Sequence, residues 1–191
     1  MNKPNFIGTF DINCQLCDDL ISYFEKNSTK HRTGQTNTKL DKSVKNSTDL
    51  IIKPNEIDKI QDKILVEYFN NLLTCIIKYY ESWPFLKESF PNLDIGYFII
   101  QKYNPGGHFK KIHSERTSIN SLHRVLVFMT YLNDDFDDGN TYFDHYDLSI
   151  IPKKGKTLIW PAEWTHAHRG NEVKNGNKYI ITGWFNVALN H

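Results

Sequence analysis

The chain has 191 residues, and its 23 basic and 22 acidic side chains give a formal net charge of +1. This length suits one domain with a substantial buried core. Such a balanced charge provides no overall field to attract nucleic acid or an anionic membrane, so neither partner is expected. The first ten residues lack a signal-peptide core, and no apolar run reaches membrane-spanning length. Three cysteines cannot all pair, which favours a reducing, cytoplasmic location.

Two helices are predicted in the N-terminal half. Apolar residues recur on one helical face over residues 13–26, with Asp11 or Asn13 as candidate N-caps. A longer helix is predicted from about residue 54 to residue 82, because apolar side chains again repeat at helical spacing. Pro84 is expected to end this second helix.

Two other segments of this half give weaker signals. Residues 28–44 are polar and rich in Thr, Lys and Asn, and they are predicted to form a mobile loop. Residues 45–52 show too little pattern for an assignment. Cys14 and Cys17 form a C-x-x-C motif, but no second cysteine pair completes a metal cage. We interpret them as small residues packed on the first helix.

The pattern changes near residue 91. Short β-branched and aromatic segments predict strands, separated by turns rich in Gly, Asn and Asp. The predicted strands cover residues 95–103, 124–132, 141–143, 148–151, 157–160 and 178–187. Helices followed by evenly spaced strands favour a mainly β fold, a β-sandwich or jelly-roll barrel buttressed by the helices. We expect a single domain over residues 1–191, with a helical part over about 1–90 and a jelly-roll core over about 91–191.

Three side chains are candidate metal ligands. Residues i and i+2 of a strand point to the same face, so His113 and Glu115 are predicted to project together. His168 follows in a segment that returns toward the same opening. His166 competes for this role, but His168 lies ten residues before Lys178 across a Gly-Asn turn, which would place these two side by side on antiparallel strands. Two imidazoles and one carboxylate can hold iron(II) on one face and leave the other face open.

A buried cation is predicted nearby. Lys178 shares a strand face with largely apolar residues, so its ammonium would point inward, where an unpaired charge is costly. The distal carboxylate of 2-oxoglutarate would neutralise it, with Tyr103 or Tyr131 donating a hydrogen bond. The alternatives are a structural ion pair with a buried acid, or a side chain that reaches the surface. Arg116 and Trp184 are candidate substrate contacts, although a solvated charge and a plain core residue explain them equally well.

Several tracts together resemble the prolyl 4-hydroxylase-like 2-oxoglutarate/iron(II) dioxygenases, including small bacterial and viral members. The tracts are Tyr103-Asn-Pro-Gly-Gly-His-Phe, Arg124-Val-Leu-Val-Phe-Met-Thr-Tyr131-Leu-Asn, Asp138-Gly-Asn-Thr-Tyr-Phe, Ile151-Pro-Lys-Lys-Gly-Lys-Thr-Leu-Ile, His168-Arg-Gly-Asn-Glu-Val, Gly176-Asn-Lys178 and Trp184. They cover roughly residues 95–187. The resemblance implies a cupin-like double-stranded β-helix. It also implies iron bound by His113, Glu115 and His168, and 2-oxoglutarate bound by Lys178 with help from Tyr103 and Tyr131.

The implied activity is a dioxygenase that consumes 2-oxoglutarate and O2, hydroxylates a C–H bond and releases succinate and CO2. A prolyl residue of a peptide or protein is one candidate substrate. The alternatives are a dioxygenase acting on a free amino acid or another small molecule, and a cupin-like metal-binding protein without oxygenase activity. The chain departs from the family pattern at Glu115, where Asp is usual, and at Asn140, where Glu is usual. A fold-level resemblance sets neither the substrate nor the oligomeric state.

Overall fold

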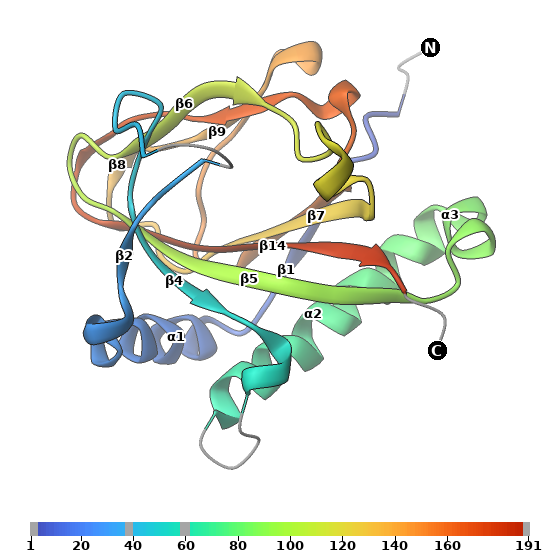
Figure 1. Ribbon diagram of the computed structural model, residues 1–191, viewed down its shortest axis with the longest axis horizontal. Coiled ribbons are helices and arrows are strands. Elements are labelled where there is room, and N and C mark those ends of the chain that lie inside the picture. The colour runs from blue at the N-terminus through green and yellow to red at the C-terminus, as the bar shows by residue number, and fades with distance from the viewer. Residues whose placement is uncertain (1–3, 37–39, 58–61, 189–191) are drawn as a thin grey trace.

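The computed structural model describes residues 4–36, 40–57 and 62–188. Its helices lie against one face of a large sheet, and a smaller sheet lies across the opposite face (Figure 1). The helices are α1 (Cys14–Lys26), α2 (Lys63–Ser82) and α3 (Pro84–Ser89). No helix in these described ranges is both long and apolar enough to span a bilayer.

The first predicted helix is confirmed, and the second is shorter than expected. The side chain of Asn13 accepts a hydrogen bond from the amide of Gln15 at 2.8 Å, so Asn13 is the N-cap of α1. A 3-10 turn occupies Pro54–Glu56, and residues 58–61 of the predicted helix lie outside the described ranges. Pro84 follows the end of α2 but also starts α3, because proline suits the first turn of a helix.

The larger sheet has seven antiparallel strands in the order β1-β11-β7-β14-β5-β4-β2. Their bounds are β1 (Gly8–Asp11), β2 (Arg32–Thr33), β4 (Thr48–Ile52), β5 (Leu93–Tyr103), β7 (Arg124–Tyr131), β11 (Lys156–Pro161) and β14 (Lys178–Val187). The strands predicted near β5, β7, β11 and β14 are confirmed within a few residues. The short strands β1, β2 and β4 were not predicted, and β2 lies inside the segment expected to be a loop.

The smaller sheet has five strands in the order β10-β9-β12-β6-β3, and a separate pair joins β13 to β8. Their bounds are β3 (Lys45–Asn46), β6 (His108–His113), β8 (Asp137–Asp138), β9 (Thr141–Phe143), β10 (Leu148–Ile150), β12 (His168–Gly170) and β13 (Val173–Asn175). The two sheets face each other as in a jelly-roll. The predicted mainly β fold buttressed by N-terminal helices is therefore confirmed.

The large sheet separates two apolar cores. On β7, Leu126 and Phe128 pack toward the helices, whereas Val127 and Met129 pack into the space between the sheets. This division follows from the two-residue period of a strand. On β14, Ile180 and Trp184 join the core between the sheets. Residues of the same parity on β14 therefore face the interior of the jelly-roll.

Two predicted placements are wrong. β6 ends at His113, so Glu115 lies in the turn after the strand and not on it. His168 lies on β12 of the smaller sheet, whereas Lys178 lies on β14 of the larger sheet. The two residues are therefore on facing sheets and not side by side. The reason is that β13 intervenes, and it pairs with β8 rather than extending either sheet.

Candidate metal and cosubstrate site

A cavity of about 630 Å³ opens between the two sheets. Side chains of both sheets line it, and among them are His113, Glu115, His168 and Lys178. The candidate metal ligands and the candidate anion-binding lysine therefore share one chamber, although they come from different sheets. Their juxtaposition results from the face-to-face packing of the jelly-roll.

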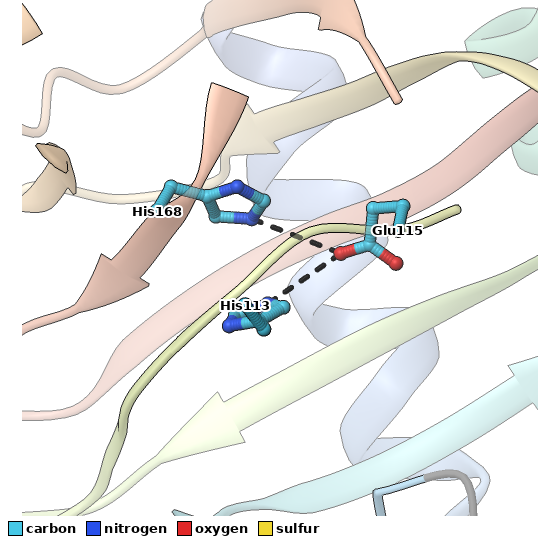
Figure 2. A group of neighbouring side chains, drawn as sticks. All are labelled: His113, Glu115 and His168. Carbon is cyan, nitrogen blue, oxygen red and sulfur yellow. Dashed lines mark ion pairs between the residues drawn. The ribbon is translucent and has the colours of Figure 1, made fainter. Parts of the chain in front are cut away.

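His113, Glu115 and His168 all line this cavity, and their side chains point toward one another (Figure 2). His168 is the direct cross-strand partner of His113 in the β12–β6 pair. The Oε1 atom of Glu115 lies 3.5 Å from Nε2 of His113 and 3.7 Å from Nε2 of His168. Donor atoms bound at about 2.1 Å to one metal ion lie about 3–3.5 Å apart, so this set fits a single ion with little movement.

Backbone carbonyls orient both imidazoles. Nδ1 of His113 lies 2.8 Å from the carbonyl oxygen of Lys111, and Nδ1 of His168 lies 2.9 Å from that of His166. A carbonyl oxygen can only accept, so Nδ1 carries the proton in each ring. The Nε2 lone pairs are therefore directed toward Glu115. Metal-binding histidines are commonly fixed by a hydrogen bond of this kind.

The charge states of the buried groups also suit a cation. Burial lowers the pKa of His168 to about 4, so this ring is neutral at physiological pH. Burial alone would raise the pKa of Glu115, but His113, His168 and Arg124 together lower it to about 2. The site thus presents a neutral imidazole and a carboxylate, the forms that bind metal ions.

Glu115 is held at several points. Its amide donates to the carbonyl oxygen of Ala162 at 3.2 Å. Its Oε2 atom accepts hydrogen bonds from Nε1 of Trp184 at 3.0 Å and from Nη1 of Arg124 at 3.2 Å. Trp184 lines the cavity, as expected of a substrate contact, but its N–H is directed to Glu115. Arg124 had no assigned role in the sequence.

Arg116 and His166 occupy other surroundings. The guanidinium of Arg116 pairs with Glu163 at 2.5 Å and lines a second, largely apolar cavity of about 390 Å³. Arg116, a predicted substrate contact, therefore does not line the cavity that contains the candidate metal ligands. His166 is buried, and its Nε2 lies 2.8 Å from the carbonyl oxygen of Asn5, so its ring is turned away from the three donors.

Lys178 lies between the two predicted tyrosines. Its Nζ is 5.5 Å from the ring centre of Tyr103 and 5.4 Å from that of Tyr131. Only 4% of Lys178 is exposed, and burial lowers its pKa to about 7. Nζ donates a hydrogen bond to the carbonyl oxygen of Gly139. No carboxylate within the described ranges lies within 4.0 Å of Nζ, so the structural ion pair is not found there.

Residues that the sequence did not single out complete this end of the cavity. Thr141 lines the cavity, and its Oγ1 lies 2.6 Å from the hydroxyl of Tyr131. The hydroxyl of Tyr103 donates to Oε1 of Gln101 at 3.1 Å. The amide of Gln101 in turn donates to Asp49. Thr141 could have been found, because it belongs to one of the family-like tracts.

A jelly-roll with two histidines and one carboxylate on a cavity wall defines a cupin-like metal-binding class of protein. Residues 98–186 match the model of the 2OG-Fe(II) oxygenase superfamily. The jelly-roll core of the chain is thus similar to this superfamily, and the predicted prolyl 4-hydroxylase-like resemblance is confirmed. The matched family uses Fe(II) as the metal and 2-oxoglutarate as the cosubstrate.

Two sequence relatives match parts of the chain. A protein of Acanthamoeba polyphaga mimivirus, provisionally named a prolyl 4-hydroxylase, is 33% identical over 70 residues. Human procollagen-lysine,2-oxoglutarate 5-dioxygenase 2 is 34% identical over 65 residues. The matches cover 32% and 34% of this chain, but 29% and 9% of the respective relatives. The chain therefore spans much less than two thirds of these relatives.

Solved structures agree with the fold over nearly the whole chain. A viral collagen prolyl hydroxylase from Paramecium bursaria Chlorella virus-1 aligns with a TM-score of 0.65 at 19% identity, over 96% of this chain and 97% of that one. A prolyl-4-hydroxylase from Pseudomonas putida aligns with a TM-score of 0.72 at 14% identity, over 94% and 92%. A prolyl hydroxylase from Trichoplax adhaerens gives 0.73 at 13% identity, over 96% and 84%.

Proposed function

We propose that this chain is an iron(II) dioxygenase that uses 2-oxoglutarate and O2 to hydroxylate a C–H bond, releasing succinate and CO2. His113, Glu115 and His168 would hold the iron. The observation that carries the proposal is the convergence of their three donor atoms, all within 4.8 Å of one another, in the cavity that also contains Lys178.

Bound iron(II), together with 2-oxoglutarate, activates O2 and supplies oxidising chemistry that amino-acid side chains lack. The chain supplies orientation and charge. The fixed Nδ1 protons of the two histidines keep their Nε2 lone pairs available. Glu115 contributes one negative charge. Lys178 would neutralise the distal carboxylate of 2-oxoglutarate, with a hydrogen bond from the Tyr131 and Thr141 hydroxyl pair.

A prolyl residue of a peptide or protein is the substrate that we propose. Two structural relatives are named as prolyl hydroxylases, and a third is a prolyl hydroxylase in complex with a fragment of the hypoxia-inducible factor oxygen degradation domain. The cavity is also larger than a five-carbon diacid requires. Tyr97 and Ile112, each about two-fifths exposed, line it and offer apolar contact area to a polypeptide.

The same proposal treats residues 1–191 as one catalytic domain. Its support is that β1 and β4, from the N-terminal half, belong to the sheet that carries Lys178. An intracellular, reducing location is also part of the proposal, because Cys14, Cys17 and Cys75 are all unpaired.

The test is anaerobic addition of iron(II) and 2-oxoglutarate, monitored by visible charge-transfer absorption, followed by aerobic assay of succinate with prolyl peptides. We expect His168→Ala to abolish the absorption band. His145→Ala is the matched control, because His145 is exposed and lies outside the cavity lining. Retention of the band in His168→Ala together with its loss in His166→Ala would refute the ligand assignment.

A further inference from the structure

The two carboxylate oxygens of Glu115 have different neighbours. Oε1 faces the Nε2 atoms of His113 and His168 at 3.5 and 3.7 Å. Oε2 instead accepts hydrogen bonds from the indole of Trp184 and the guanidinium of Arg124. A carboxylate can bind a metal ion through one oxygen or through both. The partners of Oε2 therefore determine whether one or both oxygens of Glu115 are available to bind the metal.

We infer that Arg124 and Trp184 are positioning residues that restrict Glu115 to coordination through Oε1 alone. The inference rests on the proposed function and adds a control of coordination number. A hydrogen bond to an ionised acceptor is about twice as strong as a neutral one, so two of them oppose rotation of Oε2 toward the metal. One coordination position is thereby kept free for the cosubstrate or O2.

The two positioning residues also hold each other. The guanidinium carbon of Arg124 lies 3.7 Å from the ring centre of Trp184, a close cation–π contact. Nη2 of Arg124 donates to the hydroxyl of Tyr97 at 3.3 Å. The side chain of Arg124 is only 8% exposed. The conformation of the Arg124 side chain is therefore fixed before any metal binds. Metal binding then costs little conformational entropy at this residue.

Arg124 contacts both the backbone and the side-chain carboxylate of Glu115. Nη1 donates to the backbone carbonyl oxygen of Glu115 at 3.0 Å as well as to Oε2 at 3.2 Å. A glutamate has one more rotatable bond than an aspartate, so its carboxylate is less well fixed by the backbone alone. Contact at both ends folds the longer side chain back and compensates for this freedom. The two contacts with Arg124 thus explain how glutamate can take the place of the usual aspartate as a metal ligand at this position.

The experiment uses Co(II) as the probe, titrated into metal-free protein that contains residues 1–191 and followed by visible absorption. Trp184→Phe removes the indole N–H but keeps a ring against Arg124. We expect about tenfold weaker Co(II) binding, as is usual when an outer partner of a metal ligand is lost. The visible bands should also weaken, because a second oxygen ligand raises the coordination number of cobalt.

Trp164→Phe is the matched control for loss of an indole. Trp164 is exposed and lies outside the cavity lining, so this change should leave the cobalt affinity and spectrum unchanged. In a Glu115→Asp background the carboxylate is withdrawn from Trp184. There, Trp184→Phe should weaken Co(II) binding by less than about threefold, a non-additive result.

Arg124→Lys provides a second, milder variant that keeps the charge, and far-ultraviolet circular dichroism checks that each variant is folded. We expect an intermediate loss of affinity, since an ammonium cannot contact both ends of Glu115 as the guanidinium does. Wild-type affinity and spectrum in both Trp184→Phe and Arg124→Lys would overturn the inference alone. Failure of the wild-type chain to bind Co(II), with His168→Ala indistinguishable from it, would overturn the proposed function as well.

Discussion

Lys178 and Tyr103 are direct cross-strand partners on β14 and β5, and the ammonium of Lys178 lies over the Tyr103 ring. Tyr131 presents its ring to the same ammonium at 5.4 Å. Aromatic faces attract a cation, and the attraction grows when water is excluded. These contacts do not replace lost hydration, because the pKa of Lys178 is still lowered to about 7. An anionic ligand would complete the charge balance.

Lys178→Met should raise the KM for 2-oxoglutarate about 100-fold, because truncating one member of a buried charge pair costs about 3 kcal/mol. Iron(II) affinity should change little, since Lys178 is not one of the donors. Lys174→Met is the control, because Lys174 is exposed and pairs with Asp138 at the protein surface. An unchanged KM in Lys178→Met would refute the anchoring role.

The affinity for 2-oxoglutarate should fall as pH rises above about 7. Burial lowers the pKa of Lys178 to about 7, so the free site loses its positive charge above this pH. The dicarboxylate binds the protonated form, and the apparent affinity should decrease by up to about tenfold per pH unit. Calorimetry between about pH 6 and pH 9 measures this slope. Lys178→Arg should flatten the profile because a guanidinium stays charged.

The lowered pKa of Lys178 has the opposite effect on the stability of the ligand-free protein, which should rise with pH. Unfolded lysine keeps its proton up to a pKa of 10.5, so between about pH 7 and that value the unfolded chain binds more protons at this position. The contribution of Lys178 to the free energy of unfolding therefore becomes more favourable to the fold as pH rises. Comparing urea unfolding of wild type and Lys178→Met across this window isolates the effect. The difference between the two should narrow toward high pH.

Tyr131→Phe should weaken 2-oxoglutarate binding about tenfold, whereas Tyr103→Phe should change it by less than about threefold. The hydroxyl of Tyr103 already donates to Gln101, whose amide orientation is fixed by Asp49. Loss of a hydrogen bond to a charged group costs about 1.5–3 kcal/mol, which only Tyr131 would supply. Calorimetry on both variants checks the order, and the reverse order would contradict it.

Asp49→Asn should destabilise the protein by about 3 kcal/mol. Lys45 and Asp49 form a buried ion pair of 2.7 Å, and removing one charge leaves the other buried without compensation. The double variant Lys45→Met, Asp49→Asn should be less destabilised than Asp49→Asn alone, because no charge remains buried and an amide oxygen can still accept from Gln101. Urea unfolding measures both. A double variant that loses the sum of the single effects would show that the two charges act independently.

Much of the jelly-roll was predictable because its long strands carry a two-residue period that local sequence reveals. β1 could not be predicted, because its four residues gain their order from pairing with β11, where Gly8 lies opposite Ile159. The Lys45–Asp49 pair was missed for a related reason. Both residues are polar, and they are buried only because β3 pairs with β6 and β4 pairs with β5.

The three candidate metal ligands converge, but the choice of His168 relied on a wrong placement. The offset from Lys178 favoured His168 over His166, yet these two segments lie in facing sheets. The actual cause is the direct pairing of His168 with His113 across β12 and β6. The contact of Arg124 with Glu115 could not be predicted, because Glu115 lies in a turn. A turn has no repeating pattern from which the direction of a side chain can be inferred.

The N-terminal segment is linked to the candidate metal ligand His168 by hydrogen bonds through His166. Asn5 contacts the His166 ring, and the His166 carbonyl in turn orients the imidazole of His168. A truncation or fusion that displaces Asn5 would therefore loosen a candidate metal ligand more than 160 positions away in the chain, without touching the cavity. For protein engineering, Asn5 should therefore be kept, because it supports the residue that orients His168.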